Sequence, residues 1–179
     1  MSKIQVSLKR LAMLFLCVVA LLCGLFIYLF LEGHPPKEKA LIERFYAHRA
    51  AYEALRDMLL ADQQVCAVWV RSGVETRKSG SPCMPSQRNL PAGRYNEYLV
   101  LLEQIGSAGV FRAGGSDSEI CMTVWAAGFG GDTRQVENCW LDHTPSNQVG
   151  SLDDFYKTPK PRRPVFRHID ANWYLWADW

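Results

Sequence analysis

The chain has 179 residues, of which 49% are hydrophobic and 21% charged, and its formal net charge is +2. A disordered chain is poorer in apolar residues, and a nucleic-acid-binding domain needs a larger positive charge to attract phosphate. These values exclude both classes and leave room for one folded domain of about 100–150 residues.

An uncharged segment lies near the N-terminus. Of the 21 residues from Leu11 to Leu31, all but Gly24 are apolar. As a helix this segment would be about 30 Å long, the thickness of the hydrocarbon core of a membrane. A signal peptide has a shorter apolar region and a small-residue cleavage site, and a lipoprotein has a small residue before its cysteine. The sequence therefore favours a single-pass transmembrane anchor over a cleaved signal or a lipoprotein.

Basic residues set the expected orientation of this anchor. Lys3, Lys9 and Arg10 precede it, whereas the residues that follow it have mixed charge. Basic flanks stay in the cytoplasm, so the remainder of the chain should be exported. The predicted parts are a cytoplasmic tail (1–10), the anchor (11–32), a juxtamembrane spacer (33–39) and a periplasmic domain (40–179). Without residues 1–32 the chain has 17 basic and 17 acidic residues.

The exported part begins with a predicted helix from Pro36 to about Asp62. Its apolar positions recur every three or four residues, which is the periodicity of one helical face. The stripe consists of Leu41, Phe45, His48, Tyr52, Leu55 and Leu59. A strand is then predicted at Gln64–Val70, a loop at Ser72–Pro91, and a second helix at Tyr95–Ile105.

The C-terminal half has the pattern of an antiparallel sheet. Glu119–Gly128 and Thr133–Leu141 should form a hairpin, because alternating residues flank a glycine-rich turn. A long polar connection, Asp142–Pro164, leads to a second hairpin formed by Val165–Ile169 and Trp173–Trp179. We expect one face of the last strand to be core. The predicted fold class is α+β: an N-terminal transmembrane helix followed by two helices packed on an antiparallel sheet.

Four cysteines lie in the exported part and predict two disulfides in an oxidising compartment. Cys121 and Cys139 are equidistant from Gly130, so an odd-numbered hairpin loop would place them opposite each other. Cys66 would then pair with Cys83. Because no Cys-x-x-Cys or His-x-x-x-His spacing occurs, we predict no metal site.

Three groups of residues are candidates for ligand or partner binding. His48 and Arg49 lie in or beside the apolar stripe of the first helix, although a histidine there is commonly a core residue. The cations Lys160, Arg162 and Arg163 could form a docking strip or an ordinary solvated connection. Trp176 belongs to an aromatic last strand that could bind a sugar ring or a peptide, or fill the core.

Catalytic signatures are missing from the sequence. It has no Gly-x-Ser-x-Gly elbow and no phosphate-binding glycine loop, and nothing brings its histidines to a nucleophile. We therefore predict no catalytic residue and no cofactor. Ala20 and Gly24 have the small-x-x-x-small spacing that lets two membrane helices approach, so a homodimer is possible.

Four segments together resemble a group of small uncharacterised proteobacterial envelope proteins. They are Phe45–Met58, Arg94–Leu102, Phe166–Ile169 and Asn172–Trp176. The resemblance implies an envelope location and a helix-strand-helix-sheet body, and it implies no enzyme activity. The exported cysteines and the long loop Ser72–Pro91 depart from the group.

The sequence thus favours a non-enzymatic protein of the bacterial inner membrane. Its periplasmic domain would bind a protein partner of the envelope, in an assembly or as a toxin-neutralising immunity protein, and would not bind nucleic acid. One alternative is a binding module for a small ligand or a cell-wall glycan. The other is a hydrolase without a recognisable motif.

Overall fold

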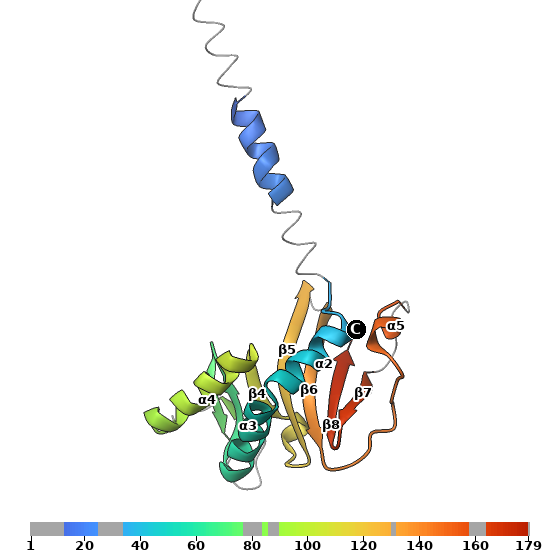
Figure 1. Cartoon of the computed structure of the whole chain (residues 1–179). Helices are drawn as coiled ribbons and strands as arrows, with labels where there is room; N and C mark the ends of the chain where they lie inside the picture. The colour runs from blue at the N-terminus through green and yellow to red at the C-terminus, as the bar shows by residue number, and fades with distance from the viewer. Residues whose placement is uncertain are drawn as a thin grey trace, which may run out of the picture. The chain divides into compact units, whose positions relative to one another are not determined.

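The computed structural model describes residues 13–24, 34–76, 84–85, 90–129, 132–157 and 164–178 (Figure 1). The chain divides into two units, residues 1–35 and 36–179. In the first unit, residues 13–24 are helical and their side chains are exposed. Among the described residues, no helix combines the length and the hydrophobicity needed to span a bilayer. Part of the predicted anchor, residues 11–12 and 25–31, lies outside the described residues.

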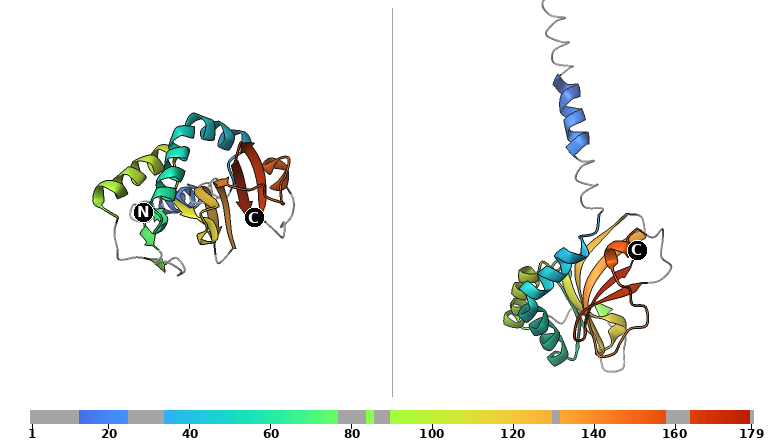
Figure 2. Two further views of the ribbon diagram at one scale, coloured as in Figure 1. Left: turned by 90° about the horizontal axis from the view of Figure 1, so that it is seen from below. Right: turned by 45° about the vertical axis from the view of Figure 1, so that its right-hand side comes forward.

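The second unit is an α+β domain, as predicted. Its strands form one eight-stranded antiparallel sheet with the order β3-β2-β1-β4-β5-β6-β8-β7. Helices α2, α3 and α4 lie on one face of this sheet (Figure 2). The strands are β1 (Val65–Trp69), β2 (Gly73–Thr76), β3 (Met84–Pro85), β4 (Gly109–Arg112), β5 (Glu119–Phe129), β6 (Asp132–Leu141), β7 (Val165–Asp170) and β8 (Trp173–Asp178). The helices are α2 (Glu38–Ala47), α3 (Arg49–Ala61), α4 (Ala92–Ile105) and the short α5 (Leu152–Phe155), with a 3₁₀ turn at Ala113–Gly115.

The first predicted helix is two helices, and the prediction of a single one was wrong. His48 has φ −122° and ψ 20°, outside the helical region, and separates α2 from α3. Its N–H donates to the carbonyls of Arg44 and Phe45, while its own carbonyl accepts from Ala51 and Tyr52. The backbone of this one residue thus forms hydrogen bonds with the last turn of α2 and with the first turn of α3. The break lets the two halves pack on different parts of a twisted sheet.

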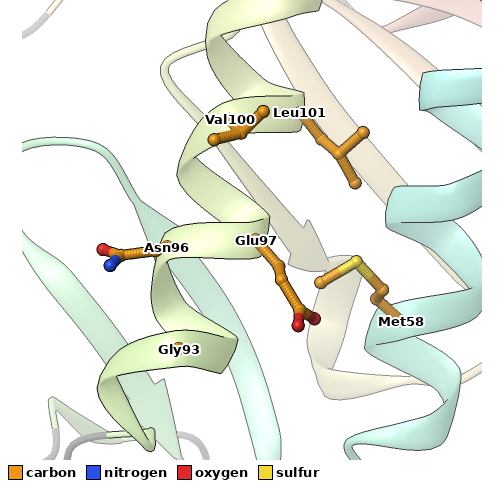
Figure 3. Close-up of a pocket in the computed structure, with 6 residues that line it drawn as sticks. All are labelled: Met58, Gly93, Asn96, Glu97, Val100 and Leu101. Atoms are coloured by element: carbon orange, nitrogen blue, oxygen red, sulfur yellow. The ribbon is translucent and has the colours of Figure 1, made fainter.

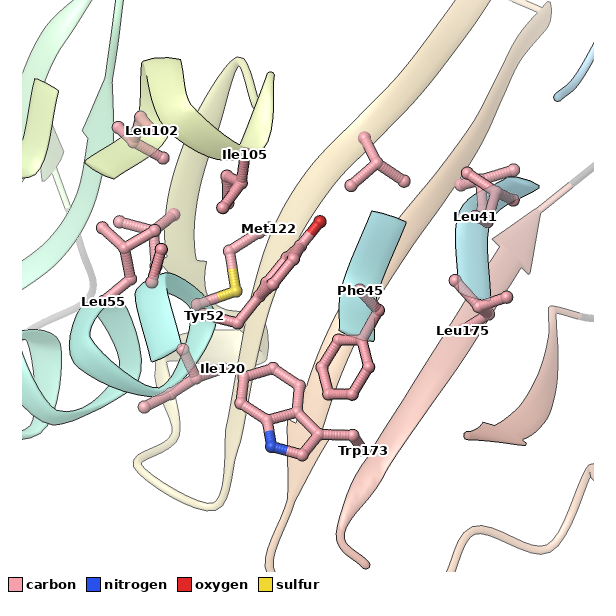
Figure 4. Packing of buried hydrophobic residues seen from close by; sticks show 14 of the residues in the cluster. Leu41, Phe45, Tyr52, Leu55, Leu102, Ile105, Ile120, Met122, Trp173 and Leu175 are labelled. Carbon is pink, nitrogen blue, oxygen red and sulfur yellow. The ribbon is translucent and has the colours of Figure 1, made fainter. Parts of the chain in front are cut away.

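The predicted apolar stripe is nevertheless buried. Leu41, Phe45, Tyr52, Leu55 and Leu59 are each at most 1% exposed. Figure 4 shows the core in which these helices pack against the sheet. The helices on either side of the break keep their apolar faces toward the same core, so burial stabilises both of them.

The last strand supplies the opposite side of this core, as predicted. Trp173, Leu175 and Ala177 of β8 face the helices and are at most 2% exposed. The Trp173 ring lies 5.3 Å from that of Phe45 and 5.9 Å from that of Tyr52, measured between centroids. This aromatic group joins α2 and α3 to β8 (Figure 4).

Two further sequence predictions need correction. The region Ser72–Pro91, predicted to be a loop, contains strands β2 and β3. The polar connection Asp142–Pro164 contains helix α5, and the side chain of its N-cap residue Ser151 accepts a hydrogen bond from the Asp154 N–H. By contrast, α4 ends as expected at Gly106, which has φ 64° in the left-handed region that glycine tolerates.

The β7 edge of the sheet is partly covered by the preceding chain. The N–H of Phe166 donates to the carbonyl of Asn147 at 2.9 Å, and the N–H of Val149 donates to the carbonyl of Phe166 at 2.8 Å. An open edge offers unpaired N–H and C=O groups to another strand. Because these two hydrogen bonds occupy the N–H and C=O groups of Phe166, another strand cannot pair with it there.

Gly109 of β4 lies directly beneath an indole ring. A Cβ atom there would overlap Cε3 of Trp69 and lie 2.8 Å from the carbonyl oxygen of Val68. We expect Gly109→Ala to lower the free energy of unfolding by about 1–3 kcal/mol, because the backbone oxygen cannot move away without disturbing β1. Urea unfolding measures this change. Gly150→Ala, where no atom lies within 4 Å of the new Cβ, should unfold like the parent, and equal losses in both variants would contradict the steric argument.

Candidate functional site

Arg49, one of the predicted binding residues, connects two elements of the fold. Its Nε donates to Glu53 at 2.8 Å, and its Nη1 donates to Asp170 at 2.5 Å. The pair with Asp170 ties α3 to the end of β7, whereas the pair with Glu53 lies within α3. The bond to Glu53 raises the pKa of Arg49. Its neighbour His48 occupies the helix break and is half-buried. Both residues therefore have structural roles that account for their positions.

Trp176 lies on the opposite, helix-free face of the sheet. Its neighbours in sequence, Leu175 and Ala177, point into the core beneath the helices, so the indole points the other way. There it packs with other side chains in a small second cluster. The buried members are Cys121, Cys139, Leu141 and Tyr174, and Phe111, Ala113, Phe166 and Trp176 pack against them. The structure does not bring Trp176 together with His48 and Arg49. The remaining predicted binding residues, Lys160, Arg162 and Arg163, lie outside the described residues.

The predicted disulfide between Cys121 and Cys139 is confirmed. The two residues are directly opposed on β5 and β6, with Cα atoms 4.1 Å apart, and are at most 1% exposed. Cys66 is also disulfide-bonded, and its predicted partner Cys83 lies outside the described residues. Glu119 lies within 4.8 Å of both sulfurs of the first pair. Because a metal ligand must be a thiolate and these sulfurs are bonded to each other, the group is no metal site in the oxidised protein.

Glu137 is a buried carboxyl group beside this disulfide. It is only 5% exposed and lies opposite Thr123 in the β5–β6 pairing. Burial raises its pKa to about 8, and the charges of Glu119 and Asp178 act in the same direction, whereas a hydrogen bond with Thr123 acts against them. The carboxyl is therefore mostly protonated at neutral pH. In the sequence Glu137 looks like one of several solvent-facing polar residues, so alternation alone could not identify it.

Two of the described histidines, His143 and His168, have rings held by hydrogen bonds to nearby residues. The ring of His143 is hydrogen-bonded to Asp142, and the ring of His168 to the carbonyl oxygen of Ala171. Neither the Asp142 carboxylate nor the Ala171 carbonyl is a hydroxyl or thiol nucleophile from which the ring, acting as a base, could take a proton.

A shallow apolar groove runs along the outer surface of α4, next to α3. It has a volume of about 480 Å³ and is lined by Met58, Gly93, Asn96, Glu97, Val100 and Leu101. Figure 3 shows Met58, Glu97 and Leu101 facing one another across the two helices. Val100 is 64% exposed, the largest value among the exposed large hydrophobic side chains described in the second unit. Sequence reasoning missed this groove. The available signal was the run of four apolar residues from Leu99 to Leu102, which is wider than one helical face.

Comparisons with known proteins assign no family. No family model matches the chain, and neither a curated protein nor a solved structure matches it. The resemblance to proteobacterial envelope proteins therefore stays a prediction.

Proposed function

We propose that the chain is a single-pass membrane protein whose α+β domain is a non-enzymatic protein-interaction module in the bacterial periplasm. The disulfide between Cys121 and Cys139 carries this proposal. It is buried between two central strands, so the domain is built around an oxidised pair. Such pairs persist in the periplasm and are rare in the reducing cytoplasm. The apolar segment Leu11–Leu31 and the basic residues before it supply the route of export.

The interaction role is supported by what the described side chains do. Arg49 serves to hold elements together, and the rings of His143 and His168 are hydrogen-bonded to a carboxylate and a carbonyl. An exposed apolar groove remains on the helical surface. Exposed apolar surface is costly in water and marks sites of association. Within the envelope, the partner would be a component of an assembly or a toxin that the domain neutralises.

Membrane topology provides the first test. Alkaline phosphatase fused after Trp179 should be active in bacterial cells, because this enzyme needs the periplasm to form its own disulfides. Removing residues 1–32 should abolish that activity and leave Cys121 and Cys139 open to alkylation in unfolded protein. A full-length fusion that is inactive, with reduced cysteines, would refute the proposed location.

Partner capture provides the second test. Chemical crosslinking in intact membranes, followed by purification of the full chain, should recover one specific envelope protein. Purified full chain in detergent should not sediment with isolated peptidoglycan. Retention on peptidoglycan without a protein partner would replace the interaction role by glycan binding.

A further inference from the structure

The α3–α4 groove combines an apolar floor with an acidic rim. Val100 lies one helical turn from Glu97 and one turn from Glu103, because residues three apart share a helix face. Both carboxylates are exposed. On the α3 side, Met58 reaches the groove beside Asp57, whose carboxylate is 62% exposed. The exposed apolar side chain is thus framed by negative charge.

The cations near the groove do not fully balance its carboxylates. Arg94 donates to Asp62 at 2.9 Å and to Glu97 at 2.8 Å, so one guanidinium serves two carboxylates. Arg56 pairs with Asp57, and its guanidinium lies over the ring of Trp140. Near the groove stand four carboxylates (Asp57, Asp62, Glu97 and Glu103) and three guanidinium groups (Arg44, Arg56 and Arg94), of which Arg44 lies against Gly106 at the end of α4, and their formal charge is −1. An approaching segment with positive charge is therefore attracted.

We infer that the groove binds an amphipathic helix of a partner protein that carries an apolar stripe flanked by Lys or Arg. This inference rests on the proposed interaction role and assigns its surface and the class of its partner. An apolar side chain of the partner packs against Val100, Leu101 and Met58, and cations one turn before and after it approach Glu97 and Glu103. The groove is shallow and its lining runs along α4 from Gly93 to Leu101, which fits a helix lying along α4 (Figure 3).

The charge of the rim argues against two other occupants. Anionic lipid headgroups would be repelled by the carboxylates. A second copy would meet the same acidic rim in a symmetric contact, which places like charges close together. Strand addition is also disfavoured at the β7 edge, where Asn147 and Val149 already bond Phe166. The helical groove is the docking surface that the charges favour.

A designed peptide tests the assignment with the full chain in nanodiscs of neutral phosphatidylcholine. The probe is a fluorescent helical peptide of about 18 residues, with leucines on one face and lysines flanking them. Its control has glutamates in place of the lysines. Fluorescence anisotropy against empty nanodiscs corrects for binding to lipid. The lysine peptide should bind at least about tenfold more tightly than the glutamate peptide.

Variants locate the binding surface. Val100→Lys should weaken binding of the lysine peptide at least about tenfold, because a cation replaces the apolar contact. Val70→Lys is the matched control, since Val70 is 45% exposed in the turn after β1, and it should bind like the parent. Glu103→Lys should weaken the lysine peptide and strengthen the glutamate peptide. Equal binding by Val100→Lys and the parent, or equal affinity for both peptides, would overturn the assignment.

The same variants separate this inference from the proposed function. If the crosslinked envelope partner is captured equally by Val100→Lys and the parent, the groove assignment is wrong and the interaction role stands. If neither protein captures a partner, the interaction role itself fails. Self-association that disappears in Val100→Lys would show that the occupant is a second copy, which also contradicts the inference.

Discussion

Replacing Arg112 by methionine is expected to lower the free energy of unfolding by about 3–5 kcal/mol, since a buried charge network would lose its donor. The Arg112 side chain is fully buried under α3. Its Nε donates to the carbonyl of Val65 at 2.8 Å, and its other nitrogens donate to the carbonyl of Leu59 and the carboxylate of Asp117. Methionine keeps much of the length but offers no N–H group. The carbonyl groups at the end of α3 and the start of β1 would then lose these donors.

Urea denaturation at neutral pH measures this effect, with two companion variants. Arg112→Lys keeps the charge and part of the bonding, so it should fall between the parent and Arg112→Met. Arg56→Met removes a partly exposed guanidinium that pairs with exposed Asp57, and it should cost less than about 1 kcal/mol. Equal losses in Arg56→Met and Arg112→Met would show that the buried network adds no special stability.

Glu137→Gln is expected to flatten the dependence of stability on pH. In the unfolded chain the Glu137 carboxyl loses its proton near its ordinary pKa of 4.5, whereas in the folded domain it keeps the proton up to a pKa of about 8. Between these two values the folded state binds more protons, so stability falls as the pH rises. Below pH 4.5 the Glu137 carboxyl is protonated in both states, so it costs the folded state no stability. Above a pH of about 8 the loss of unfolding free energy is complete and amounts to about 3–5 kcal/mol.

Chemical unfolding between about pH 4 and pH 9 provides the measurement. The glutamine side chain introduced by Glu137→Gln stays neutral, so the variant should match the parent at about pH 4 and be more stable by about 3 kcal/mol at about pH 9. Burial also raises the pKa of Glu119, which adds a residual slope of the same sign in both proteins. Glu103→Gln changes an exposed carboxyl and serves as the control that should follow the parent. Parallel pH profiles for Glu137→Gln and the parent would contradict the assignment of a buried neutral carboxyl.

The main elements of the domain were predictable from local periodicity. Helix α4 and the two hairpins are found where the apolar pattern and the glycine signals placed them. The break at His48 was not predictable, because the apolar stripe continues through it with unchanged spacing. The cause of the break is tertiary: α2 packs toward β8 through Phe45 and Trp173, while α3 contacts β1 and β4. The same limit applies to β2 and β3, which are short and are defined by the pairing of β2 with β1 and of β3 with β2.

The predicted disulfide was correct although the pairing has a feature that the sequence did not show. A β-bulge between Thr123 and Trp125 shifts the register by one residue. Beyond the bulge, Phe129 pairs with Asp132, a register that would place Cys121 opposite Trp140 if it continued. The extra residue in β5 restores the opposition of Cys121 and Cys139. The odd-numbered loop on which the prediction rested was wrong, because only two residues separate Phe129 from Asp132, and the bulge in β5 supplies the additional residue.

The candidate site was less predictable than the fold. The sequence singled out charged and aromatic residues. In the structure, Arg49 forms a tertiary ion pair with Asp170, and Trp176 belongs to a cluster on the helix-free face. The groove on α4 depends on how far α3 stands from it, which is a property of packing. Leu99 and Leu101, the apolar neighbours of Val100, are partly buried, so Val100 points between them toward solvent.

The covered edge of β7 has a consequence for a protein held at a membrane, as proposed for this chain. Anchoring confines molecules to two dimensions and raises the frequency at which neighbouring domains collide. An open edge strand would then promote aggregation, since each collision could pair the edge strands of two sheets. Residues 147–149 precede β7 in the chain, so during the proposed export they emerge before it and can bond Phe166 as soon as the strand forms. Crowded copies can therefore fold side by side without their sheets joining at Phe166.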